Sequence, residues 1–266
     1  MRAFRIAYDG SPYFGFQRQP EVPTVEDALL SALSALGVAD GLPAGYAASG
    51  RTDRGVSALA QTVSFECPEW LTPAAFNSEL PADVRAWAST PVGDDFHARY
   101  DAESRAYVYH LHAPEFDDGA VSEALSKLAR EHDFHNLTPE TERTERALYD
   151  ASAARNGPFL TLRFRGDSFC RHQIRRTATL LAEIGSGERD AGSVDRVLSP
   201  ESLSGGEGIG AAPAEALVLT DVSYPDTSFE VDPEAAESAR AVFETKRVER
   251  ETAARVAGTV SEGIGE

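Results

Sequence analysis

A loop with several reactive side chains lies between two strand-like segments, at residues 49–57, and reads Ser-Gly-Arg-Thr-Asp-Arg-Gly-Val-Ser. Loops of this kind often carry binding and catalytic residues. Side chains two positions apart in an extended backbone point the same way, so Arg51 and Asp53 can converge while Thr52 packs elsewhere. A nearby guanidinium keeps a carboxylate ionised, as a nucleophile or base requires. These residue types allow chemistry at Asp53, but on their own they fit a turn held by a structural Arg–Asp pair better, since surface ion pairs are common.

The segments on either side of this loop predict a layered fold of strands and helices. Phe4, Ile6 and Tyr8 alternate with polar or small residues, as in a strand. A helix is predicted to begin at Thr24, with Asp27 at the capping-box offset, and to end at Gly37. Further strands are predicted at 58–66, 84–90, 105–112, 146–154, 158–165 and 217–224, and helices at 120–130 and 168–185.

The order strand, helix, strand, strand occurs about twice, once before residue 100 and once after it. This order favours an α+β fold over a doubly wound sheet. We therefore expect an N-terminal α/β half over 1–100, which carries the reactive loop at 49–57 as its catalytic loop, and a C-terminal α/β half over 101–230. The Gly-rich stretch 204–212 is predicted to be a loop. The charged, Ala-rich tail over 231–266 is either a solvated helix that frays toward its end or a disordered segment.

The composition predicts a soluble protein of the cytoplasm. With 266 residues and 42% hydrophobic content, the chain can bury a sizeable core. No apolar run approaches the roughly 18 residues that cross a bilayer, and the first residues predict a strand instead of a signal peptide. The two cysteines, Cys67 and Cys170, cannot build a disulfide framework and are expected to be packing residues.

A net charge of -18 argues against a polyanionic partner. However, only Lys127 and Lys246 are lysines among the 25 basic residues, and an acidic surface with scarce lysine is typical of a halophilic protein. The Debye length is about 3 Å at 1 M salt, so there only the local charge of a binding groove matters. The segment Arg171-His172-Gln173-Ile174-Arg175-Arg176 is the strongest basic patch. It suits an RNA backbone, and a solvated helix face is the alternative.

The motif Gly50-Arg51-Thr52-Asp53, followed by Gly55-Val56 and Ala58, resembles the GRTDxGVxA signature of the TruA family of tRNA pseudouridine synthases. Other segments resemble that family in the same order and span residues 4–225. They are Tyr8-Asp9-Gly10-Ser11, Gly15-Phe16-Gln17-Arg18-Gln19-Pro20, Thr24-Val25-Glu26, Asn77, Leu80-Pro81, Asp83-Val84, Phe96-His97-Ala98-Arg99, Arg105-x-Tyr107-x-Tyr109, His132-Asp133-Phe134, Gly166, Ser168-Phe169, Arg175, Ala212-Pro213, Leu217-x-Leu219 and Val222-x-Tyr224-Pro225.

The resemblance implies a pseudouridine synthase fold, in which two ferredoxin-like (RRM-like) halves form a continuous, mostly antiparallel sheet flanked by helices. It also implies a homodimer that needs no metal and no organic cofactor. The implied reaction is the isomerisation of uridine to pseudouridine in the tRNA anticodon stem-loop, near positions 38 to 40.

Four residues match functional positions of the family, and each has a structural alternative. Asp53 matches the nucleophile, although it could cap a turn. Arg51 matches the arginine that helps expose the target near the carboxylate, and it could be a clamp. Tyr107 matches the tyrosine that stacks on the flipped base, and it could be a core aromatic. Arg175 matches the helix arginine that approaches Asp53, and it could contact phosphate.

Several positions depart from the usual family pattern, namely Phe16, Arg54, Ser57, Arg130 and Thr179. We expect these differences to change RNA contacts and helix packing more than the chemistry of the Asp53 carboxylate. Together with the acidity and the scarce lysine, they look archaeal.

Three other readings compete with this one. Gly166-Asp167-Ser168-Phe169 resembles the nucleophile block of GDSL esterases, but no Asp-x-x-His follows it. His132 and His135 could bind a metal from a helix, although no convergent ligand set is evident. The alternative from another class is a tRNA-binding protein that has lost catalysis, and the presence of Asp53 together with its partners argues against it.

Overall fold

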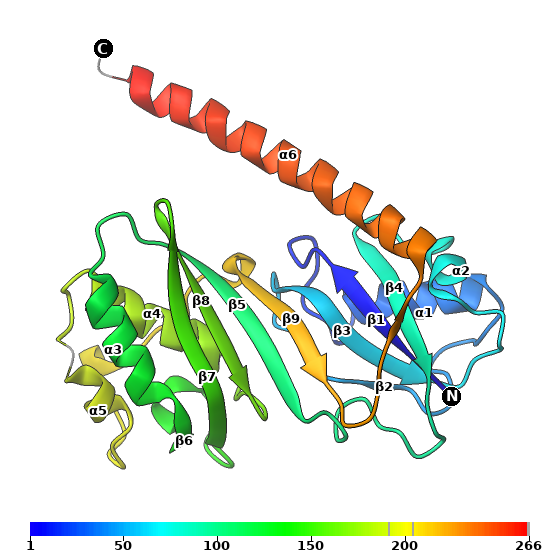
Figure 1. Cartoon of the computed structure of the whole chain (residues 1–266), viewed down its shortest axis with the longest axis horizontal. Coiled ribbons are helices and arrows are strands. Elements are labelled where there is room, and N and C mark those ends of the chain that lie inside the picture. The colour runs from blue at the N-terminus through cyan, green and yellow to red at the C-terminus, as the bar shows by residue number, and fades with distance from the viewer. Residues whose placement is uncertain (191, 204, 265–266) are drawn as a thin grey trace.

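The computed structural model describes residues 1–190, 192–203 and 205–264. These residues form a 10-stranded sheet in the order β10-β4-β1-β3-β9-β5-β8-β7-β6, with β2 also paired to β3 (Figure 1). Its strands are β1 (Arg2–Tyr8), β2 (Ala47–Ala48), β3 (Ser57–Phe65), β4 (Val84–Pro91), β5 (Ser104–His112), β6 (Arg130–Asp133), β7 (Glu145–Asn156), β8 (Phe159–Gly166), β9 (Leu217–Ser223) and β10 (Glu230–Val231).

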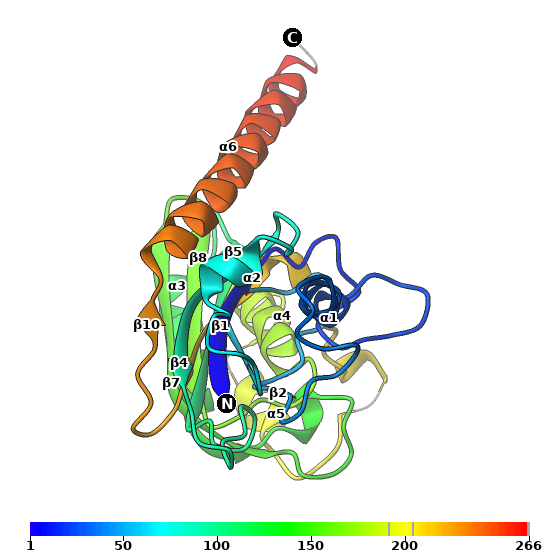
Figure 2. The same ribbon diagram turned by 90° about the vertical axis from the view of Figure 1, so that its right-hand side faces the viewer.

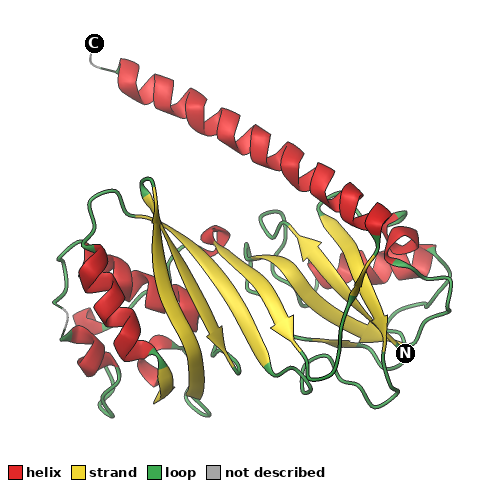
Figure 3. Ribbon diagram, in the orientation of Figure 1, coloured by secondary structure: helices red, strands yellow, loops and turns green. Residues whose placement is uncertain are grey.

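Helices flank this sheet (Figure 3). The α-helices are α1 (Val25–Ala35), α2 (Pro73–Asn77), α3 (Asp118–Leu128), α4 (Gln173–Gly185), α5 (Ser193–Val197) and α6 (Pro233–Gly263). Short 3-10 turns are η1 (His135–Leu137), η2 (Gly205–Glu207) and η3 (Ala214–Ala216). The expected α+β class, with one continuous and mostly antiparallel sheet, is confirmed. None of the helices in the described ranges is long and apolar enough to cross a membrane.

Each half of the sheet repeats the strand order of a ferredoxin-like unit. In the first half the strands lie in the order β4-β1-β3-β2, and in the second half in the order β9-β5-β8-β7. In each unit, the strand that comes first in the chain (β1 or β5) lies inside the order. The strand that comes second (β2 or β7) lies at its end. The halves join where β9 pairs in parallel with residues 57–58 of β3, while β2 pairs with residues 63–64 of the same strand.

Two hydrophobic clusters lie under this sheet, one in each half. In the first, Leu29 and Leu33 of α1 pack with Phe4 and Ile6 of β1. Thr24 caps α1 by accepting a hydrogen bond from the Asp27 amide at 3.2 Å, as its sequence predicts. The second cluster contains Leu125 of α3 and residues of α4, η3 and β8. Figure 2 shows α1 and α4 on the same side of the sheet, so both clusters fill one layer.

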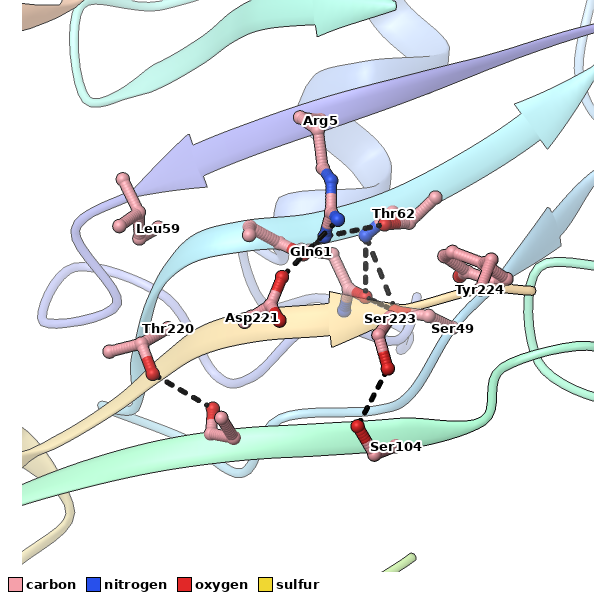
Figure 4. A network of polar contacts seen from close by, with 12 residues as sticks. Arg5, Ser49, Leu59, Gln61, Thr62, Ser104, Thr220, Asp221, Ser223 and Tyr224 are labelled. Carbon is pink, nitrogen blue, oxygen red and sulfur yellow. Dashed lines mark hydrogen bonds and ion pairs between the residues drawn. The ribbon is translucent and has the colours of Figure 1, made fainter. Parts of the chain in front are cut away.

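The seam between the halves carries a buried polar network (Figure 4). The Arg5 side chain on β1 donates to the Ala60 carbonyl at 3.2 Å, and its Nη2 lies 3.3 Å from Asp221 Oδ1 on β9. Ser104 on β5 and Ser223 on β9 share a hydrogen bond of 2.7 Å. Because buried polar groups must find partners, this network favours one register between the halves.

Some elements differ from the sequence predictions. The helix predicted over 168–185 begins only at Gln173, because His172 has φ 61° and the Cys170 amide donates to the Gln173 side chain at 2.8 Å. The helix predicted over 120–130 ends at Leu128, and Arg130 begins β6 with φ 109°. Ser204, at the start of the predicted Gly-rich loop, lies outside the described residues.

The C-terminal tail forms the long helix α6, which is one of the two predicted alternatives. Its first turns bury Ala235, Ala236 and Ala239 beside β4 and α2. Asp232 caps the helix by accepting a hydrogen bond from the Ala235 amide at 3.0 Å. The second half projects away from the sheet (Figures 1 and 2).

Candidate active site

The reactive loop lies at the junction of the two halves. It leaves the sheet after β2, which pairs with the end of β3, and returns at Ser57, where β9 pairs with the start of β3. Residues 49–56 therefore lie beside elements from both halves. A side chain on this loop can meet groups from segments that are distant in sequence.

The loop backbone is fixed on both sides of Asp53. Thr52 is buried, and its hydroxyl shares a hydrogen bond of 2.7 Å with Tyr8 Oη. The Phe16 amide donates to the Thr52 carbonyl at 3.1 Å, and the Val56 amide donates to the Asp53 carbonyl at 3.1 Å. Thr52 thus packs inward, as the alternation of the loop predicts. These contacts hold the Asp53 backbone from both neighbours.

Gly55 is needed where the loop turns back toward β3. Its φ of +83° lies in the left-handed region that side chains rarely adopt. A Cβ at this position would also lie 3.0 Å from Glu215 Oε1. The glycine two residues after Asp53 therefore sets the direction in which the loop presents the carboxylate.

Asp53 faces two side chains from the start of α4. Arg175 Nη1 lies 3.3 Å from Asp53 Oδ2, and His172 Nε2 lies 3.4 Å from the same oxygen. The Asp53 side chain remains 28% exposed, so a substrate can reach it. Arg175 is itself held because its Nε donates to the Ala212 carbonyl at 2.7 Å. This geometry places the Asp53 carboxylate next to a fixed guanidinium.

Arg51 does not take the place that the loop pattern suggests. Its side chain is exposed, and within the described part of the chain it forms no ion pair with Asp53. The guanidinium that meets the carboxylate comes instead from Arg175, which lies 122 residues further along the chain. An ion pair between Arg51 and Asp53, which the loop pattern allows, is therefore not formed among the described residues.

Tyr107 is partly buried on β5 and belongs to the same region. Its ring packs edge-on against Phe169, with 5.3 Å between the ring centroids. Burial raises the pKa of Tyr107 to about 12, the Arg105 guanidinium lowers it, and the charge of Asp53 adds to the rise. The phenol is therefore neutral near pH 7 and lies within electrostatic reach of the carboxylate.

His172 is a candidate site residue that the sequence analysis assigned only to the basic segment. It precedes α4 with φ 61°, a left-handed conformation that is uncommon outside glycine. Burial lowers the pKa of His172, as do Arg175, Arg171 and Arg176, while Asp53 raises it. The imidazole is therefore neutral near pH 7 and faces the carboxylate. Its place inside the helix predicted over 168–185 gave no signal of that contact.

Arg105 also has a role that the sequence analysis missed. Its guanidinium donates to four backbone carbonyls, those of Ser49 at 3.1 Å, Ala102 at 3.3 Å, Asp167 at 2.7 Å and Arg99 at 2.6 Å. It thereby ties the start of the reactive loop to the segment that precedes α4. The Arg105-x-Tyr107 spacing, which places both side chains on one face of β5, was the available signal.

The Gly-Asp-Ser segment and the His132–His135 pair, which suggested competing functions, have the following local structures. The Ser168 amide donates to Asp167, so this Gly-Asp-Ser segment forms a turn beside β8. His132 lies on β6 and His135 in η1, so they do not share the helix that a paired metal site was expected to use. Over residues 1–190, 192–203 and 205–264, no three His, Cys, Asp or Glu side chains are placed to hold a metal ion.

Comparison with known proteins gives a consistent result. A family model described as tRNA pseudouridine synthase matches residues 5–101 and 124–225. A protein of Natronomonas pharaonis named tRNA pseudouridine synthase A is 55% identical over 98% of this chain and 99% of its own length. Proteins of the same name from Haloarcula marismortui and Archaeoglobus fulgidus are 51% and 36% identical, over 99% and 86% of this chain and 100% and 86% of their own lengths.

Proposed function

Because the chain belongs to the tRNA pseudouridine synthase family, we propose that Asp53 is the nucleophile with which it isomerises uridine in tRNA. Membership of this family makes the protein an isomerase that acts on tRNA. The observation that carries the proposal is the partly exposed Asp53 carboxylate at the junction of the halves, 3.3 Å from the Arg175 guanidinium.

The proposed reaction exchanges one bond for another at the same sugar. Asp53 attacks the base or the sugar of the target uridine, and the glycosidic C–N bond breaks. The base turns and rejoins the sugar through C5, and the bond between Asp53 and the substrate breaks, which returns the free carboxylate. The C5 proton is then lost and N1 gains one. Both routes use the same carboxylate, which lies next to the Arg175 guanidinium.

The other expected residues have separate roles in this proposal. Tyr107 stacks on the flipped base, because it is a partly exposed aromatic within electrostatic reach of Asp53. Arg51 is exposed, so it contacts RNA when the target is extruded instead of pairing with Asp53 in the free protein. Arg171 is exposed beside the start of α4 and contacts the phosphate backbone.

We further propose that the targets are uridines of the anticodon stem-loop, at positions 38 to 40, as the resemblance of the GRTD loop implies. We also propose that the protein works as a homodimer in the cytoplasm, at high salt. The net charge of -18 and the presence of only two lysines support function at high salt. At high salt the distant acidic residues are screened, so RNA is affected mainly by the local charge of the binding groove.

The test is pseudouridine formation on unmodified tRNA transcripts at molar KCl. Wild type, Asp53→Asn and Asp94→Asn are compared, since the Asp94 side chain is 96% exposed and provides a matched control. We expect wild type and the Asp94 variant to convert uridine. The Asp53 variant is expected to fold and to bind tRNA without converting it. Mapping the modified positions tests the anticodon assignment. An active Asp53 variant, or wild type that binds a range of tRNAs and converts none, would overturn the proposal.

A further inference from the structure

The projecting helix α6 is attached to the rest of the molecule at a second point. Lys246 Nζ lies 2.9 Å and Arg250 Nη2 lies 2.6 Å from Asp9 Oδ2, in the segment that follows β1. The Asp9 side chain is only 4% exposed. Lys246 is 7 residues beyond Ala239, the last buried residue at the base of α6, so about 10 Å of helix separates this contact from that base.

Asp9 depends on these two cations. Burial raises the pKa of Asp9, but the hydrogen bonds from Arg250, Lys246 and Ser11 outweigh it and hold the pKa well below its usual range. The Ser11 hydroxyl donates to Asp9 Oδ1 at 2.7 Å, and the Ser11 amide at 3.2 Å. Without the α6 cations, an ionised carboxylate would stay buried with only Ser11 as a partner, which is unfavourable.

The residue after Asp9 touches the reactive loop directly. A Cβ on Gly10 would lie 2.1 Å from the Val56 carbonyl oxygen, so only glycine permits this approach of the two backbones. The Gly10 amide donates to Ser57 Oγ at 3.0 Å. A displacement of Asp9 therefore moves the backbone that lies against residues 55–57, two to four positions after Asp53.

The same segment contacts the loop at two more places. The Gly55 amide donates to the Tyr13 carbonyl at 3.4 Å, and the Arg54 guanidinium lies 4.1 Å from the centre of the Phe14 ring. With the bond from Phe16 to Thr52, residues 10–16 thus support the loop from Thr52 to Ser57. The path from α6 to the loop consists of Asp9 and this supporting segment.

We propose that Lys246 and Arg250 are positioning residues, which act through Asp9 to hold the reactive loop in its productive geometry. Helix α6 lies outside the residues that the family model matches. The inference rests on the proposed role of Asp53, because it assigns to α6 the placement of that carboxylate. A shift of about 1 Å at a reacting group can cost on the order of 100-fold in rate, so a distant ion pair can matter.

The test compares the full-length double variant Lys246→Met/Arg250→Met with wild type, by single-turnover pseudouridine formation and by tRNA binding. The expected result is a rate at least about 10-fold lower with a Kd within about twofold of wild type. The single variant Arg250→Met keeps Lys246 and is expected to show a smaller loss. It provides the measurement if the double variant does not fold. Lys127→Met is the matched control, because among the described residues the ion-pair partners of Lys127 are the exposed Glu123 and Asp195.

A rescue experiment separates positioning from stability and from RNA contact. In an Asp9→Asn background the buried charge is absent, so the two methionine substitutions are expected to lower the rate by less than about twofold relative to Asp9→Asn alone. An unchanged rate with a lower Tm would show a merely stabilising role and overturn the inference. So would a weaker Kd at an unchanged rate, or an equal rate loss in both backgrounds. Activity in Asp53→Asn would instead reject the proposed nucleophile.

Discussion

Asp53 and Arg175 meet across the junction of the two halves, with Arg175 Nη1 3.3 Å from Asp53 Oδ2 although 122 residues separate them. The guanidinium is held by the Ala212 carbonyl and is 17% exposed, so it lies next to Asp53 in the protein without RNA. We therefore expect Arg175 to act on the Asp53 carboxylate, whereas the exposed Arg171 is expected to act on the substrate.

Arg175→Met is expected to lower the single-turnover rate by about 100-fold, because it removes a preorganised charge at the reacting group. Arg171→Met removes an exposed charge from the same segment and is expected to weaken tRNA binding with little effect on the bound rate. Rates at saturating enzyme and binding curves at one salt concentration distinguish the two. Equal effects of both variants on binding alone would mean that Arg175 is a phosphate contact.

His172 is expected to give the reaction an acid limb. Its pKa is lowered from 6.5 by burial and by Arg175, Arg171 and Arg176, against the opposing effect of Asp53. Near pH 7 the imidazole is neutral, and at lower pH its protonated form pairs with Asp53 and competes with the substrate. The rate should therefore fall with a midpoint below pH 6.5, and this limb should be absent in His172→Gln.

The same shift affects stability in a defined direction. Because the folded-state pKa of His172 is lower than that of the unfolded chain, stability is unaffected by this group above about pH 6.5 and decreases below it. Unfolding free energies of wild type and His172→Gln between pH 5 and 8 check this. A wild-type stability that rises relative to the variant below pH 6.5 would contradict the sign.

Tyr8→Phe should destabilise the protein by about 1 to 3 kcal/mol, because it leaves the buried Thr52 hydroxyl without its partner. Tyr149→Phe is the control, since Tyr149 is 57% exposed. Urea unfolding at high KCl measures both differences. A cost for Tyr8→Phe no larger than for the control would show that water or another group satisfies Thr52.

Activity and folding are expected to persist at molar KCl and to weaken in dilute buffer. The net charge of -18 produces self-repulsion that salt screens. Unfolding curves from 0.1 to 3 M KCl test this expectation together with turnover. Greater stability in the dilute buffer would exclude a halophilic adaptation.

Local sequence patterns were enough to predict most of the helices and strands and to single out the reactive loop. Alternation at Phe4, Ile6 and Tyr8 specified β1, and the Thr24 cap specified the start of α1, because these signals involve neighbours within a few residues. The GRTD motif also singled out Asp53. The resemblance to the family also pointed to Tyr107 and Arg175 as functional residues. Their distances from Asp53 in space could not be predicted from their spacing in the sequence.

Three features depend on the packing of remote segments: the cation that contacts Asp53, the residue at which α4 begins and the contacts of α6. Spacing placed Arg51 near the carboxylate, whereas the parallel pairing of β9 with β3 brings the second half, and with it Arg175 and His172, to that position. The left-handed His172 delays α4 to Gln173. The contact of Lys246 and Arg250 with Asp9 joins residues more than 230 positions apart. Such contacts depend on how remote segments pack, and no local pattern records that.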